Sequence, residues 1–206
     1  MANRKSSEAW KRRQERDPYV KQARRDGWRS RSVYKLQQID QQEHILRPDM
    51  VAIDLGAAPG GWCQYAGEHL KGRVRLIALD LLEMDSLPSV EFIQGDFTED
   101  AVFERLLELL GDSKADLVMS DMAPNISGTK AIDQPKSMYL VELALDLARK
   151  VLKPKGSFIC KVFQGQGTDA FIADVRKDFG RVKAMKPEAS RAGSSEVYLV
   201  ARNYQL

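Results

Sequence analysis

The apolar residues of this chain follow two patterns that alternate along the sequence. Short runs of consecutive apolar residues, typical of buried strands, are separated by longer stretches in which apolar positions recur at helical spacing. The runs predict strands at residues 51–55, 74–79, 90–93, 115–120, 157–162, 182–185 and 196–201, and the longer stretches predict helices at residues 29–46, 60–70, 100–110, 135–152 and 168–179. Because strands that alternate with helices form right-handed βαβ units, we expect an α/β fold around a mostly parallel seven-stranded sheet, with helices on both faces.

The last two predicted strands are separated by a loop rather than by a helix. Residues 186–195 contain Pro, Ser, Arg and Gly and have no helical period, and residues 125–135 are likewise expected to form a loop. The last two strands should therefore pair antiparallel, as a C-terminal hairpin that closes the sheet. Ligands of open α/β sheets bind beyond the carboxyl ends of the strands, so the residues at those ends are the candidates for chemistry.

Composition is that of an ordinary globular protein, with 206 residues, 43% of them hydrophobic and 30% charged. This length fits one domain with a substantial core. No apolar run approaches the roughly 18 residues of a membrane span, and the first thirty residues lack the apolar segment of a secretory signal. We expect a cytoplasmic protein with no membrane contact. The cysteines Cys63 and Cys160 and the histidines His44 and His69 are not spaced as metal ligands, so no metal is expected.

The net charge of +3 is unevenly distributed. Residues 1–31 carry eleven Lys and Arg against four acids, and the rest of the chain is mildly acidic. We therefore divide the chain into a basic N-terminal arm at residues 1–28 and a single domain at residues 29–206. A basic arm is typical of proteins that bind a phosphate backbone, although a solvated tail explains the charge equally well. Trp10, Tyr19 and Trp28 can stack on exposed bases or anchor the arm on the body.

A glycine-rich turn follows the first predicted strand and opens the next helix. Gly56, Gly60 and Gly61 allow the backbone to turn sharply and to approach a ligand closely. Their spacing is not the G-x-G-x-x-G of pyrophosphate-binding folds, which argues against an NAD-dependent oxidoreductase. S-adenosylmethionine, which has no phosphate, suits such a turn.

Three aspartates occupy the expected ligand edge. Asp80 ends the second strand, where a carboxylate can accept both ribose hydroxyls of an adenosine. Asp96 follows the third strand and can accept from the adenine amino group, or alternatively cap the next helix. Asp121 ends the fourth strand, where its charge can attract a sulfonium and an ammonium.

Lys161 is the most unusual of the charged residues. It ends the fifth strand among apolar neighbours, where a lysine either extends its amine to solvent or is functional. Glu196 begins the last strand and can face the same crevice, and Lys35 lies on the predicted helix 29–46.

Several segments closely resemble the FtsJ/RrmJ family of RNA methyltransferases. The similar segments lie in the family's order and cover roughly residues 28–202: DLGAAPGGW at 54–62, LDLL at 79–82, QGDF at 94–97, SDMAPN at 120–125, KVFQG at 161–165 and SSEVY at 194–198. The resemblance implies a Rossmann-like S-adenosylmethionine-dependent methyltransferase. It further implies 2′-O-methylation of a uridine in the A-loop of 23S rRNA, in the assembled large (50S) ribosomal subunit, by a cytoplasmic enzyme that we expect to be a monomer.

The resemblance also assigns roles to particular residues. The family's catalytic tetrad falls on Lys35, Asp121, Lys161 and Glu196, with Lys161 as the proton acceptor. Its cofactor contacts fall on Gly60, Trp62, Asp80, Asp96 and Asp121, to which the turn adds Gly56 and Gly61. An ordinary lysine of pKa about 10.4 is neutral in only about one molecule in 2,500 at pH 7. Lys161 could therefore act as the base, or stay charged and orient the hydroxyl.

Other functions fit parts of this pattern. An amino methyltransferase acting on a base would share the cofactor half of the site, but has no evident need for Lys161. A different RNA, such as tRNA, could be the substrate, and a non-catalytic ribosome assembly factor could retain the fold. Arg191 and Lys130 are weaker candidates for phosphate contacts, because charges in loops are usually only solvated.

Overall fold

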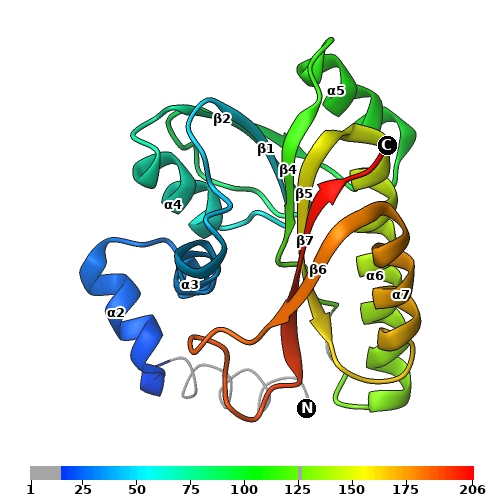
Figure 1. Ribbon diagram of the computed structural model, residues 1–206. Helices are drawn as coiled ribbons and strands as arrows, with labels where there is room; N and C mark the ends of the chain where they lie inside the picture. The colour runs from blue at the N-terminus through cyan, green and yellow to red at the C-terminus, as the bar shows by residue number, and fades with distance from the viewer. Residues whose placement is uncertain (1–14, 125–126) are drawn as a thin grey trace.

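The computed structural model describes residues 15–124 and 127–206. Within these ranges a seven-stranded sheet has the order β3-β2-β1-β4-β5-β7-β6 and lies between two layers of helices (Figure 1). The strands are β1 (Met50–Leu55), β2 (Val74–Asp80), β3 (Val90–Gln94), β4 (Ala115–Ser120), β5 (Leu152–Phe163), β6 (Phe179–Met185) and β7 (Glu196–Tyr204). The helices are α2 (Pro18–Asp26), α3 (Val33–Glu43), α4 (Gly61–His69), α5 (Asp100–Leu110), α6 (Lys130–Val151) and α7 (Thr168–Asp178). The α/β fold predicted from the sequence is confirmed.

The central strands are apolar on both faces because helices cover both faces of the sheet. All six residues of β4 are buried, and β4 pairs in parallel with β1 and with β5. The predicted antiparallel pairing of β6 with β7 is also present. However, β7 lies between β5 and β6 and is antiparallel to both, so the last strand inserts into the sheet and β6 forms its edge.

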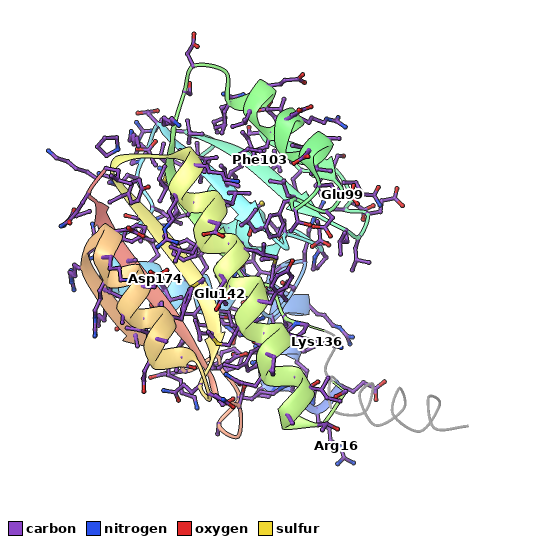
Figure 2. All side chains as sticks on the ribbon, turned by 90° about the vertical axis from the view of Figure 1, so that its right-hand side faces the viewer. Arg16, Glu99, Phe103, Lys136, Glu142 and Asp174 are labelled. Atoms are coloured by element: carbon purple, nitrogen blue, oxygen red, sulfur yellow. The ribbon has the colours of Figure 1, made fainter. Side chains whose placement is uncertain are left out.

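Two hydrophobic cores lie on opposite faces of the sheet. The first is formed under α5, α6 and α7 and the second under α2, α3 and α4. Figure 2 looks onto the first layer, in which α6 with Glu142 and α7 with Asp174 lie in front of the sheet. The second layer includes α3 and α4, which carry the predicted site residues Lys35 and Trp62. Ala23 of α2 is buried in the core beneath this layer.

Two helices differ from the sequence prediction. Helix α6 begins at Lys130, where a loop was expected, and includes Pro135. Pro135 has no backbone N–H, so one carbonyl in the first turns of the helix lacks its hydrogen-bond donor. Near the start of a helix such a carbonyl can bind water instead. Helix α3 begins at Val33 rather than Arg29, because residues 29–32 form a turn before it.

Helix α2 was not predicted, although the sequence contains the signals for it. Asp17 caps the helix by accepting from the backbone N–H of Tyr19 at 3.0 Å, Pro18 begins it, and Gly27 ends it with φ +76°. Asp before Pro, followed by a glycine after the last turn, is a helix pattern that the charge of this segment obscured. The predicted contribution of Trp10 lies outside the described residues, and the boundary at residue 28 stays a prediction. No helix among the described residues is long and apolar enough to cross a membrane.

Candidate active site

The three glycines of the turn between β1 and α4 stand where a side chain would collide with its neighbours. Gly56 has φ +73°, and a Cβ there would lie 2.5 Å from Cγ of Met122. Gly60 has φ +102°, and a Cβ there would lie 2.9 Å from Cδ1 of Leu87. Gly61 has ordinary backbone angles, but a Cβ there would collide with a serine hydroxyl of the turn before α3. A side chain is thus excluded at each of the three positions by neighbouring protein atoms. The close approach to a ligand stays a prediction.

Trp62 is buried, and its side chain is committed to the protein core. Its Nε1 donates to the carbonyl of Ser32 at 2.9 Å, and its ring packs 5.8 Å from the ring of Tyr198. A contact with a cofactor would therefore come from the backbone N–H of Trp62, in the first turn of α4. The N–H groups of a first helical turn lack intrahelical partners and point toward a ligand.

Asp80 and Asp96 both lie at the carboxyl edge of the sheet. The Asp80 carboxylate accepts from the backbone N–H of Ala58 at 2.9 Å and from that of Leu82 at 2.8 Å. It thereby fixes the glycine turn to the end of β2. Asp96 accepts from the N–H and the hydroxyl of Thr98 through one oxygen. This is a local turn and not the alternative of a helix cap, because the N-cap of α5 is Glu99. The adenine contact of Asp96 stays a prediction.

Asp54, at the end of β1, provides a test of whether the site suits a cation. The carboxyl group is buried, and burial raises its pKa to about 7. A hydrogen bond of 3.2 Å from the Cys63 thiol opposes this rise, while the negative charges of Asp121 and Asp80 add to it. Acids that hinder one another's ionisation favour a bound positive charge. S-adenosylmethionine, with its sulfonium and ammonium, fits these residues.

Lys161 and Asp121 are brought together by the pairing of β4 with β5. Ser120 lies opposite Cys160 in the parallel register, so the next residue of each strand meets at the sheet edge. The Lys161 Nζ donates to the backbone carbonyl of Asp121 at 2.6 Å and lies 3.1 Å from its Oδ1. Only 7% of the Lys161 side chain is exposed.

Lys35 and Glu196 form the second pair. The Lys35 Nζ lies 2.7 Å from Glu196 Oε1, and both side chains are buried. Glu196 lies opposite Phe163 across the β5–β7 pair, and Phe163 is two residues beyond Lys161 on β5. Because side chains alternate between the two faces of a sheet, Glu196 and Lys161 lie on the same face. A cavity of about 610 Å³ is lined by Lys35, Lys161 and Glu196 together with Ala123, Phe163 and other residues. The structure thus brings all four predicted tetrad residues to one place.

The charges of the two pairs interact across the site. Burial alone would raise the pKa of Asp121, but Lys161 and Lys35 hold it below the ordinary aspartate value. Burial likewise opposes ionisation of Glu196, and Lys35 followed by Lys161 lowers its pKa. Both carboxylates are therefore charged at neutral pH.

Sequence reasoning missed two residues that organise the site. The Tyr198 hydroxyl donates to Asp121 Oδ1 at 2.5 Å, and burial together with the charge of Asp121 raises the pKa of this phenol. Arg29 donates to the carbonyls of Pro59, at 3.2 Å, and of Asp85, at 2.7 Å, and so connects the glycine turn to the loop after β2. Tyr198 belongs to the SSEVY segment, which gave a signal for it, whereas Arg29 lies within a run of basic residues that conceals its role.

Comparison with known proteins identifies the family. The profile of the FtsJ-like methyltransferases matches residues 28–204. The chain belongs to this family. Among the described residues no cluster of His, Cys, Asp and Glu could hold a metal ion.

Curated relatives match over the full chain. The ribosomal RNA large subunit methyltransferase E of Pseudomonas fluorescens is 54% identical over 205 residues, covering 100% of this chain and 98% of the relative. The protein of the same name from Pseudomonas aeruginosa is 56% identical, covering 100% and 99%. The prediction of an FtsJ-family methyltransferase is confirmed.

Solved structures agree on the fold. A Plasmodium falciparum protein described as a ribosomal RNA methyltransferase has a TM-score of 0.78 and 31% identity, covering 86% of this chain and 98% of that one. Human methyltransferase-like protein 13, solved with SAH, has a TM-score of 0.61 and 14% identity, covering 83% and 82%. The second likeness concerns the fold alone.

Proposed function

We propose that this FtsJ-like methyltransferase methylates the 2′-hydroxyl of a uridine in the A-loop of 23S rRNA, in the assembled large ribosomal subunit and in the cytoplasm. Methylation of ribosomal RNA is what the family and the full-length relatives support. S-adenosylmethionine is the methyl donor, and it supplies an electrophilic methyl group bound to a sulfonium. The observation that supports reaction at a 2′-hydroxyl is the convergence of Lys161 with Asp121 beside the Lys35–Glu196 pair. The uridine, the A-loop and the assembled subunit are proposed from the resemblance of the motifs to the family.

The geometry around the Lys161 nitrogen suits a reaction at a hydroxyl. This nitrogen lies within hydrogen-bonding distance of two acceptors, the backbone carbonyl and the carboxylate of Asp121. A neutral amine has two N–H donors, which these acceptors would engage, so its lone pair would be left to take the proton of the 2′-hydroxyl. An ammonium would instead direct its third N–H to the 2′-oxygen and stabilise the developing negative charge.

The remaining residues hold this nitrogen in place. Asp121 is itself fixed by the Tyr198 hydroxyl, so its carboxylate keeps one orientation toward Lys161. Lys35 supplies a second positive charge on the same wall of the cavity, held by Glu196. A group positioned in this way contributes through proximity as well as through proton transfer.

Labelled methyl transfer to large subunits, free 23S rRNA and tRNA tests the proposal. Alkaline hydrolysis of the labelled RNA locates the product, because a 2′-O-methyl group blocks cleavage at its own nucleotide. We expect the label at a single resistant uridine in the subunit. Label that survives replacement of the acceptor by a 2′-deoxynucleotide would instead show methylation of a base, and absence of turnover on any RNA would favour an assembly factor.

The role of Lys161 is tested separately. Lys161→Ala should abolish methyl transfer, a loss of at least about a hundredfold, while S-adenosylmethionine affinity stays near that of the wild type. Loss of cofactor binding in this variant would assign Lys161 a structural role. A rise of kcat/KM near neutral pH would identify the base, and a flat profile would identify the charged orienting group.

A further inference from the structure

A second cavity adjoins the one that the tetrad lines. It has a volume of about 660 Å³ and lies between the start of α6, the loop from β5 to α7 and the loop from β6 to β7. Phe163, Gly193 and Ser194 line both cavities, so the two meet at these residues. In a nucleotide the base and the 2′-hydroxyl are attached to adjacent ribose carbons. A ribose whose 2′-hydroxyl reaches Lys161 therefore carries its base beside the tetrad, where this second cavity lies.

The lining of the second cavity suits an uncharged ligand. Asp133 is the one charged side chain of the described residues that line it. This carboxylate accepts from the N–H and the hydroxyl of Ser127, each at 2.8 Å, and from the N–H of Gly128 at 2.9 Å, so it serves to hold the loop before α6. A phosphate would face this negative charge and would find no cation among these lining residues. A nucleobase is neutral, and a mainly uncharged lining with a few polar groups is typical of a pocket for such a ligand.

Phe163 provides an aromatic surface at the junction of the two cavities. It ends β5 and is half-buried, and its ring centre lies 5.8 Å from the Lys161 Nζ. The two side chains lie on the same face of the sheet, because they are two residues apart on one strand. Aromatic side chains bind unstacked RNA bases through the flat face of the ring. The ring is therefore placed to contact the base of a nucleotide whose ribose lies at Lys161.

Gln134 offers a hydrogen-bond acceptor in the same cavity. Its Nε2 donates to the backbone carbonyls of Phe163 and Gln166, both at 3.1 Å. Carbonyls only accept, so the amide nitrogen must face them, and the Oε1 is the atom that the amide can offer to a ligand. Gly165 permits this arrangement, since a Cβ there would lie 2.7 Å from the Gln134 Oε1. The acceptor is thus held in one orientation before a ligand arrives, which favours binding.

A fixed acceptor distinguishes between the RNA bases. Uracil has an N–H at the centre of its pairing edge, as guanine does, whereas cytosine and adenine have an unprotonated nitrogen there. We propose that the second cavity binds the base of the acceptor nucleotide, with Phe163 against its face and the Gln134 Oε1 accepting from the N3–H of uracil. This inference rests on the proposed function, because it requires an RNA acceptor at the tetrad. It gives a physical reason for methylation of uridine rather than cytidine.

The ratio of kcat/KM for two acceptors tests the role of Gln134. The substrates are large subunits with uridine or cytidine at the acceptor position, purified from cells that lack the methyltransferase. The wild type should prefer uridine about thirtyfold, as expected when a desolvated acceptor loses its donor. Gln134→Met keeps the length of the side chain and removes the amide, so the preference should fall to about threefold. A merely structural role would lower both rates and leave their ratio unchanged, and that result would overturn the proposed contact.

Gln94→Met is the matched control. The Gln94 amide also donates to a backbone carbonyl, that of Leu81 at 3.3 Å, and its side chain is exposed. It lies at the end of β3, separated from β5 by β2, β1 and β4. This variant should keep the wild-type ratio, because any change in cofactor binding affects both substrates equally. A ratio that falls as far as in Gln134→Met would contradict a local contact with the base.

Phe163→Leu tests the stacking contact. The variant keeps an apolar side chain without the ring, so kcat/KM for the uridine subunit should fall about tenfold while S-adenosylmethionine affinity is retained. Phe163→Tyr, which keeps the ring, should restore it. Wild-type activity in Phe163→Leu would exclude stacking on this residue. Wild-type enzyme that methylates no RNA would refute the proposed function itself, whereas equal methylation of the uridine and cytidine subunits would refute the base site alone.

Discussion

Replacement of Asp54 by Asn should make the stability of the protein less dependent on pH. Asp54 is 1% exposed, and its carboxyl group has the Cys63 thiol as a hydrogen-bond donor. Its pKa of about 7 in the folded protein is about 3 units above the ordinary value of 3.8. At about 1.4 kcal/mol per unit, ionisation of this group in the fold opposes stability by about 4 kcal/mol.

The sign follows from proton binding. Between pH 3.8 and about 7 the folded protein keeps the Asp54 proton while the unfolded chain loses it. The free energy of unfolding is therefore highest below the ordinary pKa of 3.8, where Asp54 is protonated in both states. It decreases as the pH rises through the pKa of Asp54 in the folded protein. About 3 kcal/mol of the loss falls between pH 5 and pH 8. Asn is neutral at every pH, so the Asp54→Asn variant should not lose this stability.

Urea unfolding from pH 5 to pH 8 measures this effect. The free energy of unfolding of Asp54→Asn, relative to the wild type, should increase by about 3 kcal/mol across this range, whatever the offset caused by the new amide. Asp112→Asn, which changes an exposed carboxylate, should follow the wild type at every pH. A difference between Asp54→Asn and the wild type that stays constant with pH would refute the reasoning.

The same acid should couple cofactor binding to proton release. A cation placed near Asp54, Asp80 and Asp121 favours the ionised carboxylate, so S-adenosylmethionine should displace the Asp54 proton when it binds near pH 6. Titration calorimetry in two buffers of different ionisation enthalpy measures the protons released. Asp54→Asn should release fewer protons than the wild type, and equal release would show that another group is responsible.

Three further outcomes are expected. Tyr198→Phe removes the hydroxyl that donates to Asp121 at 2.5 Å; kcat should fall about tenfold with cofactor affinity retained, and an unchanged kcat would exclude a role in the site. Glu43→Gln leaves the cations around this buried carboxylate unbalanced and should lower the free energy of unfolding by about 2 kcal/mol at pH 7. Despite burial, these cations lower the pKa of Glu43 from the ordinary 4.5. Its contribution to stability should therefore be fully present above 4.5 and be lost in the wild type as the pH falls through the lowered pKa. Gly61→Ala should weaken S-adenosylmethionine binding, whereas Gly67→Ala, in open space on the same helix, should be neutral, and equal effects would contradict the steric argument.

The strands were predictable from sequence because the interior of a parallel sheet requires consecutive apolar residues. The run at 115–120 agrees with β4, Ala115–Ser120, residue for residue. Helix starts were less predictable, because a capping pattern competes with charge and proline signals over a few residues. Pro135 was read as a helix start, yet α6 begins five residues earlier.

The candidate site was predictable only as a set of residues. The motif segments named Lys161 and Asp121, but the distance of 3.1 Å between them depends on the register of β4 and β5. Asp17 shows the opposite case. Its two arginine partners come from other segments, and no local pattern in the sequence indicates that one carboxylate joins Arg31 to Arg191.

The strand order beyond β5 decides whether the tetrad can form. A C-terminal hairpin alone would allow either β6 or β7 to lie beside β5, since both arrangements satisfy the antiparallel pairing of the last two strands. With β6 beside β5, Glu196 would lie about 4.8 Å farther from Lys161, the spacing of one strand. Insertion of β7 instead places Glu196 opposite Phe163 and Tyr198 opposite Lys161. The carboxylate that holds Lys35 and the phenol that holds Asp121 thus both come from the last strand, so the chemistry at β4 and β5 depends on the final segment of the chain to complete it.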